Sequence, residues 1–170
     1  MTAKVRARIL VALAIIGVAI VRISEAQTSG DSDKAEVTAL NQRLSDAFNN
    51  KDITAVTALY TDDPDAIFFD ETIPFRFNKV ELTKANAMFF QSVTDYKFGM
   101  ESIDVLVGGD LAVVHCIVRN TWTDKGGTHS QTSRYTQVDR KERGKWLIWH
   151  DHASVPYDPA TGKAVLNAKP

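Results

Sequence analysis

The sequence has only one cysteine, Cys116, and therefore cannot form an internal disulfide. Its stability must come from packing, even in an oxidising compartment. The sequence also lacks an Asn-x-Ser/Thr glycosylation acceptor, which favours a bacterial periplasm over a eukaryotic secretory route. It contains no cluster or stripe of basic residues, so we expect no nucleic-acid partner. Only one apolar run is long, and its thirteen residues, Ile9 to Val21, fall short of the roughly 20 that a transmembrane helix needs.

The first 26 residues have the three parts of an export signal. Lys4, Arg6 and Arg8 form a positively charged segment before the apolar run. Ser24-Glu25-Ala26 then supplies the small-x-small pattern that signal peptidase accepts. We therefore predict a signal peptide over residues 1–26, cleaved after Ala26, and a periplasmic or secreted protein without stable membrane association afterwards. Because Arg6 and Arg8 are not adjacent, the general secretory route is favoured over the twin-arginine route. The alternative is that this segment is retained as an anchor.

The remaining 144 residues carry 16 basic and 20 acidic side chains. This length suits one domain that can bury its own core. Asp33, with Glu36 three residues later, predicts the start of a helix. Asn78 with Glu81 predicts a second such start, and Asp52 predicts a shorter helix between the two.

Strand patterns dominate the second half of the chain, where short turns separate long alternating segments. Short hairpin loops force consecutive strands to pair antiparallel. Helices followed by an antiparallel sheet indicate an α+β fold in which the helices cover one sheet face. We assign one domain to residues 33–156 and a turn-rich C-terminal extension to residues 157–170. The predicted strands are residues 66–69, 96–107, 111–123, 128–139 and 145–154.

A sequence motif lies at the C-terminal end of the predicted domain. The stretch from Trp146 to Asp158 reads W-x-I-x-H-x-H-x-S-V-P-Y-D, and it follows an R-x-T at Arg134 and an H-x-x-x-R that begins at His115. This pattern resembles bacterial SnoaL-like proteins described as ketosteroid isomerase homologues. A related H-x-H-x-S ending occurs in the association domain of calmodulin-dependent kinase II. The resemblance extends in element order over residues 33–169. It implies a cone-shaped nuclear transport factor 2-like (cystatin-like) fold, with three N-terminal helices packed on a curved antiparallel sheet around a small-molecule pocket.

The alternation of side chains assigns the motif residues to faces. On the last strand, His150 and His152 share one face and Asp151 lies on the other. His115 and Arg119 are four residues apart and also share a face. The resemblance implies that the imidazole and guanidinium groups face the pocket. The predicted ligand-binding residues are Tyr60, His115, Arg119, Arg134, His150 and His152.

Two arginines beside imidazoles would suit an anionic ligand, because a guanidinium group presents a fixed fork of donors to a carboxylate or phosphate. Our main prediction is therefore a module that binds a small anionic or polar-aromatic molecule. The alternative for the same groups is that they hydrogen-bond to one another and to the backbone, which would close the cone.

Two other functions stay open, because this fold hosts enzymes, binding modules and oligomerisation domains. One is a cofactor-free isomerase, cyclase or hydrolase that uses general acid-base catalysis, with His150 or Asp70 as the candidate catalytic residue. The familiar ketosteroid isomerase pattern is not visible, since no carboxylate falls on the expected pocket face. The other is an oligomerisation domain.

Two further chemistries receive little support from the residues. His150-x-His152, with His115 as a third ligand, resembles zinc ligation. A histidine pair on a strand is more often a hydrogen-bonded structural element, so we expect neither a metal nor another cofactor. Cys116 has apolar neighbours and no basic partner on its face, so we expect an inert core thiol.

Leu147 and Trp149 are predicted on the sheet face away from the pocket, where exposure to water would be costly. We therefore expect a homodimer packed sheet to sheet, as is common in the superfamily that the motif resembles.

Overall fold

The computed structural model describes residues 30–72 and 76–169. This part of the chain begins with three helices. The helices are residues 30–49, α2 (Ile53–Ala58) and α3 (Lys79–Ser92). Within these described segments, no helix combines the length and the apolar character needed to span a membrane. The predicted signal peptide and its cleavage site lie outside the described residues.

The first helix packs through one apolar stripe. Leu40 and Leu44 of this stripe are at most 1% exposed. The sequence predicted a start at Asp33, but the helix already includes the residues before it. Asp33 instead accepts hydrogen bonds from Lys141 Nζ at 2.5 Å and Trp146 Nε1 at 3.3 Å. Its carboxylate therefore ties the helix to the end of the sheet.

The other two helices begin at the predicted caps. Asp52 accepts a hydrogen bond from the backbone N–H of Ala55 at 2.9 Å. Asn78 Oδ1 accepts one from the backbone N–H of Glu81 at 2.9 Å, and Glu81 Oε2 accepts one in return from the backbone N–H of Asn78 at 3.0 Å. This reciprocal pair is the capping box that the sequence predicts.

Five strands form one sheet in the order β1-β5-β4-β3-β2. The four long strands pair antiparallel through hairpins, as predicted. The short strand β1 runs parallel to β5, with Phe68 opposite Asp151, so the sheet is mixed and not wholly antiparallel. This pairing arises because the segment between α2 and α3 returns beside the last long strand. The strands are β1 (Phe68–Phe69), β2 (Tyr96–Gly108), β3 (Leu111–Asp124), β4 (Gly127–Glu142) and β5 (Lys145–Ser154).

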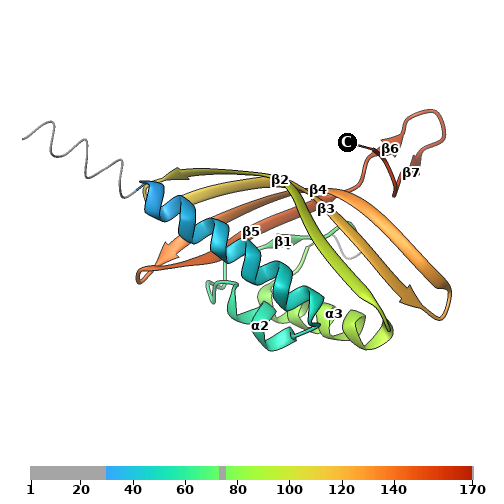
Figure 1. The fold of residues 1–170 in the computed structure, drawn as a ribbon, viewed down its shortest axis with the longest axis horizontal. Helices are drawn as coiled ribbons and strands as arrows, with labels where there is room; N and C mark the ends of the chain where they lie inside the picture. The colour runs from blue at the N-terminus through green and yellow to red at the C-terminus, as the bar shows by residue number, and fades with distance from the viewer. Residues whose placement is uncertain (1–29, 73–75, 170) are drawn as a thin grey trace, which may run out of the picture.

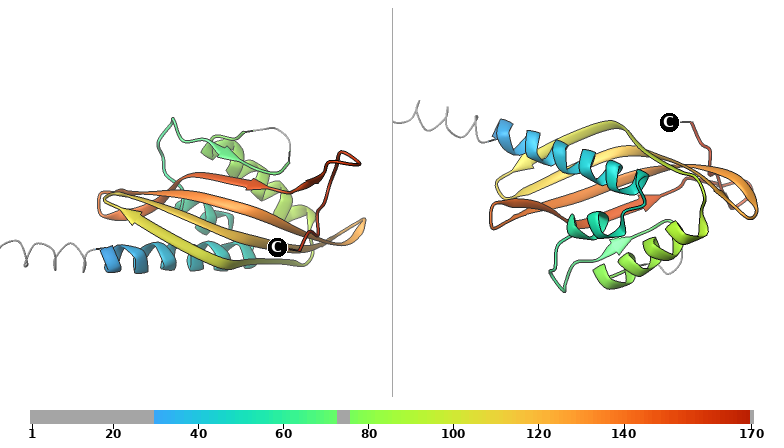
Figure 2. Two further views of the ribbon diagram at one scale, coloured as in Figure 1. Left: turned by 90° about the horizontal axis from the view of Figure 1, so that it is seen from above. Right: turned by 60° about the horizontal axis from the view of Figure 1, so that its bottom comes forward.

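The helices cover one face of the curved sheet (Figure 1), and the second view of Figure 2 shows them from that side. Val114 of β3 and Ile148 of β5 meet the helices there, and both are 0% exposed. The predicted α+β fold is confirmed. The C-terminal extension forms a small hairpin of β6 (Tyr157–Asp158) and β7 (Lys163–Ala164).

A β-bulge in β5 decides which side chains face the helices. Two consecutive residues of β4 pair with His150 and Ile148, so Trp149 between them is an extra residue in the ladder. An inserted residue shifts the alternation of side chains by one. Ile148 before the bulge and Asp151 after it are therefore both buried, at 0% and 7% exposure. An unbroken strand would place these two side chains on opposite faces.

Trp149, which the sequence predicts on the outer sheet face, is instead partly buried and packs against the hydrophobic core. The ring Nε1 donates a hydrogen bond to Asp63 Oδ2 at 3.1 Å, and the Arg140 guanidinium lies 5.4 Å from the ring centroid. Leu147 is half-buried. The apolar side chains that the sheet does expose are on β2 and β3 instead, and include Leu106 and Val113.

Candidate functional site

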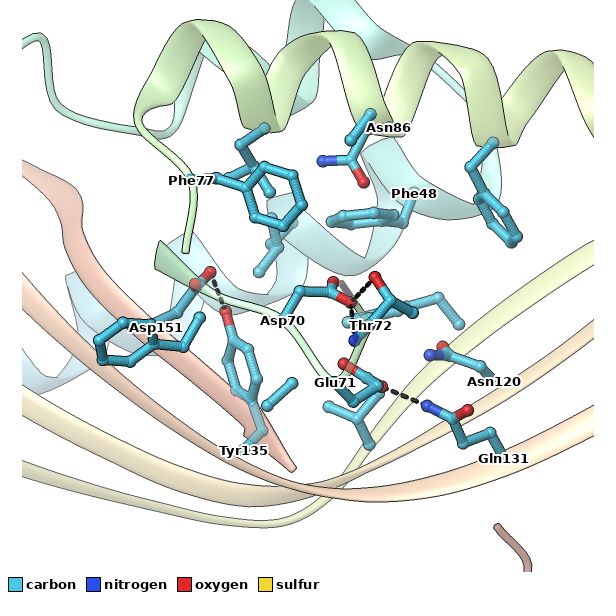
Figure 3. A pocket seen from close by; sticks show the side chains of 18 of the residues that line it. Phe48, Asp70, Glu71, Thr72, Phe77, Asn86, Asn120, Gln131, Tyr135 and Asp151 are labelled. Carbon is cyan, nitrogen blue, oxygen red and sulfur yellow. Dashed lines mark hydrogen bonds between the residues drawn. The ribbon is translucent and has the colours of Figure 1, made fainter. Parts of the chain in front are cut away.

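A cavity of about 270 Å³ lies between the helices and the curved sheet (Figure 3). Its walls are mostly apolar and aromatic, which is the usual composition of a small-molecule site. The apolar walls include Leu44, Phe48, Phe77, Leu82, Phe89, Phe98 and Trp122. The polar lining includes Tyr60, Asp70, Glu71, Thr72, Asn86, Asn120, Gln131, Tyr135 and Asp151.

Asp151 is the most deeply buried of the carboxyl groups that line the cavity. The hydroxyls of Tyr60 and Tyr135 each donate a hydrogen bond to its Oδ2 at 2.9 Å. Tyr60 is positioned by a parallel bridge to Ile148 and by an edge-to-face contact with Phe68 at 5.0 Å between centroids. The other carboxyl oxygen, Oδ1, accepts no hydrogen bond from the described residues, so it remains available to a bound molecule.

Burial changes the acid-base properties of this group. Loss of hydration raises the pKa of Asp151 to about 6, although hydrogen bonds from Tyr60 and Tyr135 oppose the rise. Burial and the negative charge of Asp151 hold the pKa values of both tyrosines well above their ordinary value, so the two hydroxyls stay protonated donors. A carboxyl group that titrates near neutrality beside fixed donors can accept or release a proton on a bound molecule.

The polar network continues behind Tyr135. The Tyr135 hydroxyl also lies 3.2 Å from Gln137 Oε1, and Gln137 Nε2 donates to Asp139 Oδ1 at 2.7 Å. Gln137 and Asp139 are both 0% exposed, and Asp139 Oδ2 has no hydrogen-bond partner within the described chain. Burial, with a smaller contribution from the charge of Asp151, raises the pKa of Asp139 to about 7. Two buried carboxyl groups are thus linked through neutral side chains.

Two more carboxylates come from the segment after β1. Glu71 Oε1 accepts hydrogen bonds from Ser133 Oγ at 2.8 Å and from Gln131 Nε2. Burial raises the pKa of Glu71, and the charge of Asp70 adds to the rise. Asp70 Oδ1 accepts hydrogen bonds from the backbone N–H and the hydroxyl of Thr72 at 2.8 and 2.7 Å. Asp70 also contributes to raising the pKa of Asp151, so its charge is felt at the buried end of the cavity.

Two carboxamides complete the polar lining. Asn86 extends from α3 toward the cavity (Figure 3), and its side chain makes no hydrogen bond to the described residues. Asn120 Oδ1 accepts a hydrogen bond from the Tyr96 hydroxyl at 3.2 Å. The donors and acceptors that these groups leave unused can orient a bound molecule.

Tyr60 and Asp70 line the cavity, where the sequence placed them as candidates. The predicted facing of His115, Arg119 and Arg134 is wrong, because all three are exposed on the opposite sheet face. His115 Nε2 lies 3.4 Å from Asp104 Oδ2, and Arg119 Nε donates to Glu101 Oε2 at 2.7 Å. The physical reason is that the alternate, apolar side chains of β3 pack on the helices.

The predicted facing of His150 and His152 is wrong for a different reason. The bulge at Trp149 turns both rings away from the cavity, and neither lines it. The two rings pack edge-to-face on Phe69, at 5.3 and 5.6 Å between centroids. His150 Nδ1 lies 2.6 Å from the carbonyl oxygen of Ile67. Whether any of the predicted residues binds a ligand stays a prediction.

Sequence reasoning missed Asp151, Tyr135 and Glu71. For β3, the decisive signal was present: Ala112, Val114 and their alternate neighbours form an uninterrupted apolar face, which a half-buried strand turns inward. That face fixes the inward side of the neighbouring strand β4 through the register, and so identifies Tyr135. For β5, no comparable signal marks the bulge.

The zinc alternative requires His115 on β3 to meet the histidines of β5, yet β4 lies between these strands. Throughout the described segments, no group of three or more His, Cys, Asp or Glu side chains is arranged to hold a metal ion.

The match to known families agrees with this architecture. The SnoaL-like domain family matches residues 37–158. The chain belongs to the SnoaL-like family. The matched residues run from the first helix to the end of β6, and so include every strand of the sheet and the whole cavity. No curated protein matches the sequence.

Solved structures share the fold of this SnoaL-like protein. An NTF2-like protein of unknown function from Pseudomonas putida is 28% identical, with a TM-score of 0.74 over 82% of this chain and 98% of that chain. An NTF2-like superfamily protein from Salmonella enterica is 20% identical, with a TM-score of 0.69 over 79% and 99%. A protein with a cystatin-like fold from Caulobacter vibrioides is 16% identical, with a TM-score of 0.62 over 78% and 93%. The predicted nuclear transport factor 2-like fold is confirmed.

Proposed function

We propose that this SnoaL-like protein binds a small, largely apolar or aromatic molecule in the cavity and orients it at Asp151. The observation that carries the proposal is a space walled by aromatic rings that contains one buried carboxyl group, held by Tyr60 and Tyr135. Burying a carboxyl group is costly, and such groups concentrate at functional sites.

The sequence predicted either an anionic or a polar-aromatic ligand, and the residues that line the cavity favour the polar-aromatic one. Among the described residues that line the cavity, none is Arg, Lys or His, whereas three are Asp or Glu. An anionic group would meet carboxylates there instead of guanidinium groups. Arg119 and Arg134, on which the anionic prediction rested, are exposed on the other face of the sheet.

A screen of neutral aromatic fragments by thermal shift tests the proposal. A fragment that binds only the folded state raises the melting temperature. Ala85→Phe, which adds a ring to the cavity wall on α3, should abolish the shift. Met88→Phe, on the same helix but 71% exposed, should preserve it. Shifts that survive Ala85→Phe would place binding elsewhere and contradict the proposal.

A second candidate function is acid-base catalysis on the bound molecule, with Asp151 as the proton carrier. The pKa of Asp151, raised to about 6, and the two adjacent hydroxyl donors favour this candidate. Of the catalytic candidates taken from the sequence, Asp70 lines the cavity and His150 does not. Mass spectrometry of bound fragments after incubation tests it: conversion by the natural protein, lost in Asp151→Asn while binding persists, would support catalysis. If every fragment is recovered unchanged, the result would contradict catalysis and support binding alone.

Export and self-association are part of the same proposal. The charged, apolar and small-x-small segments of residues 1–26 support export, and the N-terminal residue of protein recovered from its host would test it. Leu106 and Val113 are paired across β2 and β3 and are 65% and 38% exposed, which supports a homodimer through the outer sheet face. Val113→Glu should then shift the mass measured by sedimentation from dimer to monomer.

A further inference from the structure

We infer that the cavity selects a ligand with a positively charged amine or ammonium group attached to an aromatic or apolar body. This inference rests on the proposed function and adds the chemical class of the ligand.

Three carboxyl groups face the cavity, and all of their hydrogen-bond donors are neutral. The donors to Asp151 are tyrosine hydroxyls, and those to Asp70 and Glu71 are amide, hydroxyl and backbone groups. The lining of the cavity contributes no Arg, Lys or His from the described residues, so it offers these carboxylates no positive partner. His150 lowers the pKa of Asp151 from outside the cavity, and its Nδ1 is occupied by the Ile67 carbonyl.

The like charges also act on one another. The charge of Asp70 raises the pKa of Glu71 and contributes to raising that of Asp151. A cation that enters the cavity therefore relieves repulsion between groups that the fold holds together. The carboxylates of the cavity can therefore form an ion pair with a positively charged ligand.

Aromatic rings supply the second element of cation recognition. Phe89 packs edge-to-face on Tyr96 at 5.1 Å and on Trp122 at 6.1 Å, so three rings from α3, β2 and β3 form one wall. All three line the cavity with the carboxylates. Ring faces attract ammonium groups, and aromatic side chains are a common environment for a bound quaternary ammonium. The rings bury the apolar body of the ligand and the carboxylates hold its charge.

Three probes of nearly equal shape and different charge test the inference. They are benzyltrimethylammonium, its neutral carbon analogue neopentylbenzene, and the anion benzylsulfonate. Backbone amide NMR titration at pH 8 gives each affinity and identifies the site from the signals of Asn86 and Asn120. We expect the cation to bind about tenfold more tightly than the neutral hydrocarbon, which corresponds to roughly 1.4 kcal/mol. We expect no binding of the anion in the cavity.

Charge-neutral variants separate charge from shape. The double variant Asp70→Asn, Glu71→Gln keeps the side-chain volumes and an oxygen acceptor at each position. It should reduce the preference for the cation, with Asp151 left as the remaining carboxylate of the cavity. Asp65→Asn, at an exposed carboxylate that does not line the cavity, is the matched control and should keep the preference.

The outcomes distinguish this inference from the proposed function. Equal affinity for cation and hydrocarbon, tighter binding of the anion, or a preference that is undiminished in the double variant would overturn the inference while leaving small-molecule binding intact. If none of the probes binds, the inference is overturned, and the fragment screen with Ala85→Phe decides the proposed function separately.

Discussion

Tyr60 and Asp151 lie 91 residues apart in the chain, and the Tyr60 hydroxyl donates a 2.9 Å hydrogen bond to Asp151 Oδ2. This contact joins the helical half of the domain to the last long strand at the buried end of the cavity. Tyr135 donates to the same oxygen from β4. The geometry of the candidate site therefore depends on the packing of the helices against the sheet.

Removing either tyrosine hydroxyl should raise the pKa of Asp151 further above about 6, because each hydrogen bond stabilises the ionised form. Tyr60→Phe and Tyr135→Phe should each also lower the free energy of unfolding at pH 8 by about 1–3 kcal/mol, since a buried carboxylate loses a donor. Infrared or carbon-13 NMR titration of the carboxyl group measures the pKa. Tyr157→Phe, at a tyrosine that is 68% exposed, is the control. An unchanged pKa in both core variants would contradict the assigned hydrogen bonds.

Asp139→Asn should flatten the dependence of stability on pH. The pKa of Asp139 is raised from 3.8 to about 7 in the folded protein by burial, with Gln137 as its donor and Asp151 as the nearby like charge. Between these two pH values the folded state binds more protons than the unfolded state, so stability falls as pH rises from about 4 to about 7. The loss from this group is on the order of 2–4 kcal/mol. Urea unfolding across that range should show a smaller fall in the variant than in the natural protein, and parallel curves would refute the assignment.

The affinity for benzyltrimethylammonium should rise with pH between about 5 and 8. Burial raises the pKa of Asp151 to about 6, so this group loses negative charge as the solution is acidified through this range. The probe itself does not titrate, so the change reports the protein. We expect a gain of about tenfold, measured by calorimetry, and a pH-independent affinity would show that Asp151 does not hold the cation. The groups whose charge or hydrogen bonds act on Asp151 are Tyr60, Tyr135, Asp70, Asp139 and His150.

Loss of the capping box should weaken α3. Asn78→Ala removes the acceptor for the backbone N–H of Glu81, and we expect a decrease of about 1 kcal/mol in the free energy of unfolding. Asn78→Asp retains an acceptor oxygen and should cost little. Urea denaturation of the two variants makes the comparison, and equal losses would mean that the side-chain oxygen does not cap the helix.

Cys116 should be inert in the folded protein. Its side chain is 6% exposed, and burial raises the pKa of the thiol to about 12, so almost no thiolate forms at pH 8. A disulfide reagent such as dithionitrobenzoate should label the thiol only after addition of denaturant. Lys125→Cys, in an exposed hairpin, provides a reactive control in the same chain. Rapid labelling of native Cys116 would contradict its buried position.

The fold was predictable because each element carries its own signal. The caps at Asp52 and Asn78 fix two helix starts. Glycine-containing turns then delimit the four long strands, and β5 spans Lys145–Ser154 as predicted. Local spacing and turn chemistry are properties of neighbouring residues, so they can be read without knowledge of tertiary contacts.

The site was less predictable because it depends on which face of each strand is turned inward. On β3, the apolar alternation that buries Val114 was a better guide than the motif residue His115. On β5, the inward face changes at Trp149, and a bulge depends on packing between strands that local spacing does not encode. Tyr60 was predicted on the second helix, but α2 ends at Ala58, and Tyr60 reaches the cavity wall from a bridge to Ile148.

The bulge at Trp149 determines which charged side chains of β5 face the cavity. If Trp149 were instead paired within a regular strand, the alternation that buries Ile148 would turn His150 and His152 inward and Asp151 outward. The same His150-Asp151-His152 sequence would then place two imidazoles where this protein has a buried carboxyl group. Because Asp139 and Val138 are consecutive, removal of Trp149 would leave a regular ladder with Asp151 still opposite Gln137, so the bulge lets the domain hold an additional tryptophan without turning the carboxylate out of the cavity.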